Sequence, residues 1–282
     1  MREFAAAAAE QGVLVWSGQC PAQRSGHSFA LIANLVMQVF GLQGSDLPDT
    51  LNAKMESILA QWGAAAQAAR PYLQVLAGIR PPGPEAARLA NLEPESLRQQ
   101  AFAALRGLIK DVASQQPLLL VLDDLQWIDP QSASLLIFLA DLVSTVPVLL
   151  VCGIRSGETD VIDDRLVRIQ DLLRPAQTLR LRLEPLSAAV SAALATELIG
   201  GKEMPSAFSQ LVYARSEGNP YYIEEIVRML IERGYLEQTQ PGWELQLLNS
   251  DSLPLPASLA ALINSRVDSL PADLRHVLQC AA

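Results

Sequence analysis

Two adjacent carboxylates, Asp123 and Asp124, follow directly on the hydrophobic run LLLVL, and Arg155 follows a second such run, VLLVCGI. If the two runs are neighbouring parallel strands, their carboxyl ends meet at the edge where open α/β sheets bind ligands. There Asp123 would hold Mg²⁺, through water, and Asp124 would orient or deprotonate the water that attacks a γ-phosphate. The Arg155 guanidinium would bind the γ-phosphate oxygens. The pattern therefore predicts a site for phosphoryl chemistry.

Structural alternatives exist for each of these residues. Acidic residues also end strands and cap turns, and Arg155 could pair at the surface with Glu158 or Asp160. From the residues alone, both interpretations stay open. Asp129 is different, because Asp before Pro130 and an apolar-periodic segment is typical of a helix N-cap with proline in the first turn.

The apolar runs that must position these residues predict an α/β layer architecture. The two middle runs are continuously hydrophobic, as in a parallel sheet covered on both faces, whereas the outer two are half-exposed in pattern. Helical periodicity lies between them, and residues 78–96, with four prolines, are expected to form an irregular surface connection. The predicted strands are 12–18, 118–124, 146–155 and 178–186, and the predicted helices are 27–40, 51–62, 95–114 and 131–144.

After Leu186 the pattern changes to helices only, at 187–199, 205–216 and 220–233. Gly218 and Asn219 form a helix stop, and Pro220 suits the first position of the next helix. Residues 235–249 alternate around a Pro-Gly pair and predict a hairpin. Helical segments follow to the end of the chain.

Composition narrows the classes of function. The chain has 282 residues and a net charge of -9, and its basic residues are scattered, so a nucleic-acid partner is not expected. Three cysteines lie far apart, which indicates a reducing, cytoplasmic setting without structural zinc. The apolar stretch 133–154 is divided by Asp141 and Pro147, so it predicts a helix and a buried strand rather than a membrane span.

The runs DDLQWID, GIR and SEGNPYYIEE, with the segments around them, resemble the AAA-type ATPase module of signal-transduction NTPases, the STAND class. Such modules occur in large LuxR-type transcriptional regulators and beside class III adenylate cyclase or protein kinase domains. The resemblance covers nearly the whole chain. It implies that Asp123 and Asp124 are the Walker B pair, that Arg155 is the sensor-1-like arginine, and that Pro220 lies near the adenine in a turn shaped by Asn219.

The same resemblance implies ATP and Mg²⁺ as cofactors. It also implies an output domain in the same longer chain, which would be a DNA-binding, cyclase or kinase domain, and self-association. No membrane partner is expected. The implied fold class is an α/β, P-loop NTPase-like parallel sheet followed by a helical lid and the start of a winged-helix-like domain. The expected boundaries are 1–186, 187–234 and 235–282.

One departure from the family pattern concerns the phosphate-binding loop. The sequence contains no G-x-x-x-x-G-K-[ST] motif, and MREFAAAAAEQG resembles the end of the helix that follows that loop. We therefore expect a piece of a longer protein whose first strand, which would lie between 146–155 and 178–186, is missing. About five buried aliphatic residues at ~1.5–3 kcal/mol each are then lost, an amount comparable with the ~5–15 kcal/mol that stabilises a domain. The isolated chain is expected to be marginally stable and to bind ATP-Mg poorly.

The function expected from these residues is an ATP-binding, slowly hydrolysing switch, with ATPase activity in the longer protein. The alternative is a non-enzymatic interaction scaffold that kept the fold and lost nucleotide binding. Nuclease or phosphatase chemistry would need further acids or histidines near the acid pair, and His27 and His276 are far from it in sequence.

Overall fold

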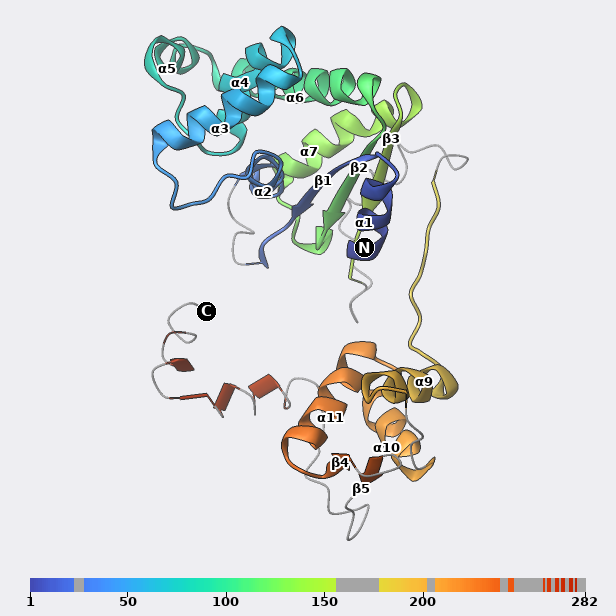
Figure 1. Ribbon diagram of the computed structural model, residues 1–282. Coiled ribbons are helices and arrows are strands. Elements are labelled where there is room, and N and C mark those ends of the chain that lie inside the picture. Colours follow the sequence, from blue (N-terminus) through green and yellow to red (C-terminus); the bar gives the residue numbers. More distant parts are fainter. Residues whose placement is uncertain are drawn as a thin grey trace. The chain divides into compact units, whose positions relative to one another are not determined.

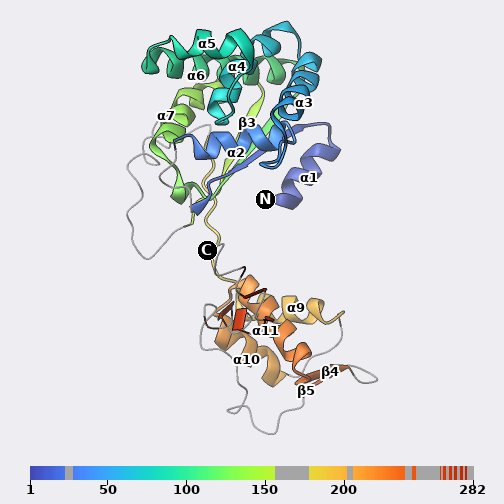
Figure 2. The same ribbon diagram turned by 90° about the vertical axis from the view of Figure 1, so that its left-hand side faces the viewer.

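The computed structural model describes residues 1–22, 28–155, 178–201, 206–238 and 243–245, with scattered residues between 261 and 277. The chain divides into two compact units, Met1–Leu179 and Arg180–Ala282, and each unit has a hydrophobic cluster of its own. Figures 1 and 2 show the elements of each unit. The division predicted at residues 186 and 234 stays a prediction.

In its described residues, the first unit alternates helices with three strands. Its elements are α1 (Arg2–Glu10), β1 (Leu14–Gln19), α2 (Ala30–Val39), α3 (Pro48–Gln61), α4 (Ala64–Leu76), α5 (Gly83–Ala90), α6 (Pro94–Gln115), β2 (Leu118–Asp123), the 3-10 turn η2 (Leu125–Trp127), α7 (Pro130–Leu139), the 3-10 helix η3 (Ala140–Ser144) and β3 (Val148–Cys152).

The three strands form a parallel sheet in the order β1-β2-β3 (Figure 1). Leu118 pairs with Leu14 on one side and with Val148 on the other, and Gln19 stands beside Asp123 at the carboxyl end. Parallel neighbours need long crossover connections, which helices supply between β1 and β2 and again between β2 and β3. The predicted α/β architecture with a parallel sheet is confirmed.

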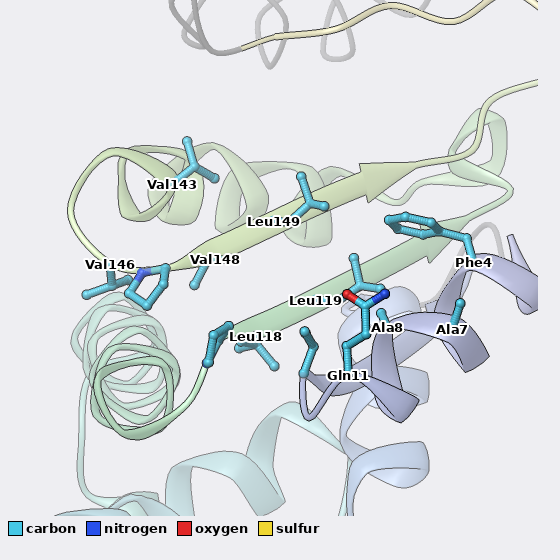
Figure 3. Close-up of a pocket in the computed structure, with 13 residues that line it drawn as sticks. Phe4, Ala7, Ala8, Gln11, Leu118, Leu119, Val143, Val146, Val148 and Leu149 are labelled. Carbon is cyan, nitrogen blue, oxygen red and sulfur yellow. The ribbon is translucent and has the colours of Figure 1, made fainter.

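The central strand β2 is buried on both faces, as its continuous hydrophobic sequence predicts. Successive side chains of a strand point to opposite faces. Leu120 therefore joins the main hydrophobic cluster, which also contains residues of α2, α6 and α7. Leu119 points to the other face and lies opposite α1 (Figure 3).

In contrast to the expectation of a second buried strand, β3 lies at the edge of the sheet. Leu149 exposes 53% of its surface. An apolar groove of about 600 Å³ lies between β3 and α1, with Leu149 and Phe4 on its walls (Figure 3). The physical reason is that, within the described ranges, no strand pairs with the outer side of β3.

The strand expected at 178–186 is not formed. The described residues there have no regular secondary structure, and Leu179, Leu181 and Leu183 are 80%, 76% and 94% exposed. Alternating leucine and polar residues provide the side-chain pattern of a strand, but a strand also needs a neighbour for its backbone hydrogen bonds. This segment has no strand partner in the part of the chain that the structure describes.

The proline-rich stretch 78–96 is not entirely irregular, because it contains α5. Pro82 is the N-cap residue of α5 and Pro84 lies in its first turn, while Pro94 begins α6. Proline is tolerated at these positions, where a backbone donor is not needed. The prolines thus begin helices instead of excluding them.

Helix α4 is a further helix that the hydrophobic periodicity did not predict.

The second unit is mainly helical, as expected. Its helices pack around Phe208, Ile223 and Ile226, which are fully buried. A short antiparallel hairpin follows, with Leu236 paired to Leu245, which confirms the hairpin predicted in 235–249. Its turn lies outside the described residues. The elements are α9 (Ala188–Leu198), α10 (Ser206–Ser216), α11 (Pro220–Glu232), β4 (Leu236–Gln238) and β5 (Trp243–Leu245).

Among the helices that the structure describes, none has the length and apolarity that a membrane crossing requires. The stretch 133–154 is divided among α7, η3 and β3, in agreement with the interpretation of a helix followed by a strand.

Candidate functional site

Polar residues end β1 and β2 and meet at one rim of the sheet, beside the chain that leaves β3. Gln19 ends β1 and Asp123 ends β2, and the two are partners in the strand register. Beyond β3, the Gly153 amide donates to the Leu122 carbonyl and the Leu125 amide donates to the Gly153 carbonyl, at 2.8 and 3.0 Å. These bonds hold the turn after β2 against the end of β3.

Asp123 is half-buried and lies across the end of β3. Its Oδ1 accepts a hydrogen bond of 2.9 Å from the backbone amide of Asp124. A Cβ atom added at Gly153 would overlap Asp123 Oδ1 and Met1 Cε. The absence of a side chain at Gly153 therefore creates the space that the Asp123 carboxylate occupies.

Asp124 begins the 3-10 turn η2 in the left-handed region, with φ 57°, a conformation that Asp tolerates better than most residues. Both carboxylate oxygens accept hydrogen bonds from carboxamides, Oδ2 from Gln19 Nε2 at 2.7 Å and Oδ1 from Gln126 Nε2 at 2.8 Å. These bonds, first from Gln19 and then from Gln126, hold the pKa of Asp124 below its ordinary value, and the charge of Arg155 acts in the same direction. Asp124 is therefore ionised at neutral pH.

Arg155 is brought to the same rim. Its backbone amide donates to Gln126 Oε1 at 3.0 Å, and its guanidinium is exposed and near enough to lower the pKa of Asp124. The structure thus gathers Asp123, Asp124 and Arg155 at one edge, as the strand pattern predicts. Glu158 and Asp160, the alternative partners of Arg155, lie outside the described residues.

Asp129 has the structural role expected of it and a second one besides. Its side chain is buried, at 1% exposure. Oδ1 accepts from the amides of Gln131 and Ser132 at 3.1 and 3.0 Å, which caps α7. The same carboxylate also accepts from the amides of Phe29 and Ala30, each at 2.9 Å. One residue therefore caps both α7 and α2.

The rim is suited to binding a hydrated divalent cation with phosphate. Mg²⁺ is usually held by one or two carboxylates together with phosphate oxygens and water, and Asp123 and Asp124 are adjacent, half-buried carboxylates. Within the described ranges, no three His, Cys, Asp or Glu side chains form a cluster able to enclose a metal. A metal held here would take its remaining ligands from water and phosphate.

In the second unit, Asn219 and Pro220 begin α11. Asn219 Oδ1 accepts from the Tyr222 amide at 3.3 Å, and Pro220 is the first helical residue. Gly218 has φ +78°, and a Cβ there would overlap the Leu186 carbonyl oxygen. The predicted helix stop and start are confirmed, whereas the roles of Asn219 and Pro220 toward a nucleotide stay predictions.

Sequence reasoning did not identify Gln19, Gln126 or Gly153 as part of this rim. Gln19 offered a signal, since it is the first polar residue with a long side chain after the apolar run VLVWSG, just as Asp123 follows LLLVL. Its backbone amide is held by Asn34 Oδ1 of α2 at 2.8 Å. Gln126 offered none, because its contacts depend on how η2 turns.

The parallel sheet is covered by helices and carries paired acids at the carboxyl end of its central strand. These features place the chain among the α/β proteins that bind ligands in the crevice outside the carboxyl ends of the strands. Residues 1–151, more than half of the chain, match the family described as AAA ATPase domain. The chain therefore belongs to the AAA ATPase domain family, which implies nucleotide binding and hydrolysis. Residues 187–237 match a family described as a domain of unknown function, DUF8739.

Among curated proteins, the chain is similar to an uncharacterized protein of Rhizobium meliloti (strain 1021). The two are 26% identical over 204 residues, which are 71% of this chain and 18% of the relative. The chain thus spans less than a fifth of the length of the curated relative that it matches.

Proposed function

We propose that this chain is the ATP-binding and slowly hydrolysing switch module of a larger signal-transduction protein. Asp123 would bind the Mg²⁺ of ATP-Mg through water, Asp124 would orient the attacking water, and Arg155 would bind the terminal phosphate. Bound Mg²⁺ would neutralise charge on the phosphate oxygens. The observation that carries the proposal is the convergence of these three residues at the carboxyl ends of adjacent strands.

The electrostatics of the rim support separate roles for the two acids. Asp124 stays ionised because Gln19 and Gln126 donate to its oxygens, and a carboxylate fixed by two donors keeps its remaining lone pairs in a defined direction. A water molecule that donates to such a lone pair would be held in a constant orientation. Asp123 has one oxygen bonded to the Asp124 amide, which leaves the other oxygen for the hydration shell of a cation.

The proposed switch also uses the second unit. Asn219 and Pro220 would contact the adenine, and nucleotide occupancy would be transmitted to an output domain elsewhere in the longer protein. The support for this step is the family resemblance of SEGNPYYIEE and the defined start of α11, where Asn219 caps the helix and Pro220 opens it.

The test is made in the complete natural protein that contains this sequence, because the curated relative is much longer than the chain. Asp123→Asn is expected to weaken Mg²⁺-dependent binding of a fluorescent ATP analogue. Asp124→Asn is expected to retain ATP and to lower kcat by about 10² to 10⁴. Asp111→Asn, on α6 away from the rim, is the matched control and should behave as wild type.

Wild-type turnover in Asp124→Asn would contradict the proposed role of that residue. A wild-type protein that binds no ATP would support the scaffold alternative instead, since a scaffold needs the fold and not the phosphate site.

A further inference from the structure

Gln126 lies between Asp124, which the proposed function assigns to the attacking water, and Arg155, which it assigns to the terminal phosphate. Its Nε2 donates to Asp124 Oδ1 at 2.8 Å, and its Oε1 accepts from the Arg155 amide at 3.0 Å. The side chain is half-buried. It thus links the end of β2 to the chain that leaves β3.

This bridge needs a carboxamide. The carboxylate requires a donor and the backbone amide requires an acceptor, and among side chains of this length only glutamine offers both without charge. Rotation of the amide group by 180° would set its oxygen against the carboxylate and its NH₂ group against an N–H. The two neighbours therefore enforce one orientation.

Gln19 provides an internal comparison. Its Nε2 donates to the other oxygen of Asp124 at 2.7 Å, and its own backbone amide is held by Asn34 at 2.8 Å. The acceptor of the Arg155 amide is Gln126 and not Gln19. Gln19 can therefore hold Asp124, whereas Gln126 can both hold Asp124 and transmit a displacement of residue 155 to it.

We infer that Gln126 is a positioning residue that couples the orientation of the Asp124 carboxylate to the backbone at Arg155. A movement of the Arg155 backbone toward an anionic ligand would displace the Gln126 side chain, which is hydrogen-bonded to it. Because the same side chain donates to Asp124, the orientation of the Asp124 carboxylate would change as well. The inference rests on the proposed function for its consequence in catalysis, but the coupling itself is a property of the free protein.

The first experiment measures the bridge without nucleotide, in the complete natural protein. In Gln126→Leu, the Arg155 amide should exchange its hydrogen faster and the pKa of Asp124 should rise toward its ordinary value, because one donor to the charged form is lost. Gln19→Leu should also raise the pKa of Asp124 but leave exchange at Arg155 unchanged. Gln67→Leu, at an exposed position of α4, should change neither.

A reciprocal pair of substitutions separates coupling from a general structural effect. Gln126→Glu sets two carboxylates against each other, so the side chain should turn away and the Arg155 amide should lose protection. When Gln126→Glu is combined with Asp124→Asn, the new carboxamide at position 124 can donate to one oxygen of the new carboxylate at position 126. The other oxygen of that carboxylate can then accept from the Arg155 amide, so protection at Arg155 should return.

With ATP-Mg, Gln126→Leu should lower kcat by about tenfold to a hundredfold, the effect expected when a reacting group is misplaced by about an ångström, and should change KM less. Unchanged exchange at Arg155 in Gln126→Leu, or no recovery in the reciprocal variant, would overturn the inference. Absence of ATP turnover in wild type would overturn the proposed function and leave the coupling result intact.

Discussion

At the scale of single residues, the site depends on space as much as on charge. Asp123 can lie across the end of β3 only because Gly153 has no side chain. The atom nearest to a Cβ added at Gly153 is a carboxylate oxygen of Asp123, the mobile end of a side chain. Substitution of Gly153 should therefore displace the Asp123 carboxylate and disturb the fold little.

Gly153→Ala is therefore expected to separate function from stability. The new methyl group would push the Asp123 carboxylate away, so Mg²⁺-dependent ATP binding should weaken by about tenfold or more, while the free energy of unfolding changes by less than about 1 kcal/mol. Nucleotide titration and denaturant unfolding measure the two quantities. Gly107→Ala, where an added Cβ meets no atom within 4 Å, is the control, and equal ATP affinity in both variants would refute the role of Gly153.

At the scale of elements, the segment between β2 and α7 is held in place by Asp129, whose carboxylate accepts hydrogen bonds from four backbone amides at the starts of two helices. Phe29 adopts φ 62° at the N-cap of α2, a conformation that a large residue enters only when its surroundings hold it. The bond from its amide to Asp129 is one such constraint. The loop after β2 and the start of α2 are thereby joined.

Asp129→Ala should be among the most destabilising substitutions in the first unit. It leaves four amides without their acceptor and removes two helix caps at about 0.5–2 kcal/mol each. With the cost of buried unpaired donors added, the expected loss is about 3–5 kcal/mol, measured by urea unfolding. A loss below about 1 kcal/mol would contradict the double-cap interpretation.

The contribution of Asp129 to the free energy of unfolding should also depend on pH. Burial acts to raise the pKa of Asp129, but hydrogen bonds from Ser132 and from the Phe29 and Ala30 amides outweigh it and lower the pKa. The stabilisation is then present above the unfolded-state pKa of about 3.9 and is lost as the pH falls through the lower folded-state value. In Asp129→Asn, this part of the acid destabilisation should disappear when unfolding is followed from pH 5 downward.

At the scale of the whole molecule, two separate hydrophobic clusters predict two unfolding transitions. Ile109 belongs to the cluster of the first unit and Phe208 to that of the second, and both are fully buried. Ile109→Ala and Phe208→Ala should each destabilise by about 2–5 kcal/mol and each lower a different transition in calorimetry. If both substitutions shift one common transition, the units do not unfold independently.

Much of the site was predictable from local pattern. The continuous run LLLVL predicted a strand buried on both faces, so Asp123 and Asp124 were expected at its carboxyl end, and the next apolar run brought Arg155 to the same side. Asp129 before Pro130 and Asn219 before Pro220 specified helix starts, because capping depends on a few adjacent residues.

Other features depended on partners that are distant in sequence. The leucines of 178–186 have the alternation of a strand, yet they remain exposed because the described chain supplies no neighbouring strand. The same cause makes β3 an edge strand with Leu149 exposed. Pattern determines which side chains a strand would bury, but pairing determines whether the strand forms.

The sequence by itself determined the class of fold, the burial of β2 and the placing of two acids and an arginine at strand ends, since hydrophobic periodicity and strand direction suffice for these. Only the tertiary structure decided that Gln19 and Gln126 hold Asp124, that Gly153 makes room for Asp123 and that Asp129 caps two helices. Most of these contacts join segments that are far apart in the sequence, up to 105 residues for Gln19 and Asp124, whereas the contact of Gln126 with Asp124 is local and depends on how η2 turns. All of them arise from the way the backbone folds and packs, which the hydrophobic pattern does not encode.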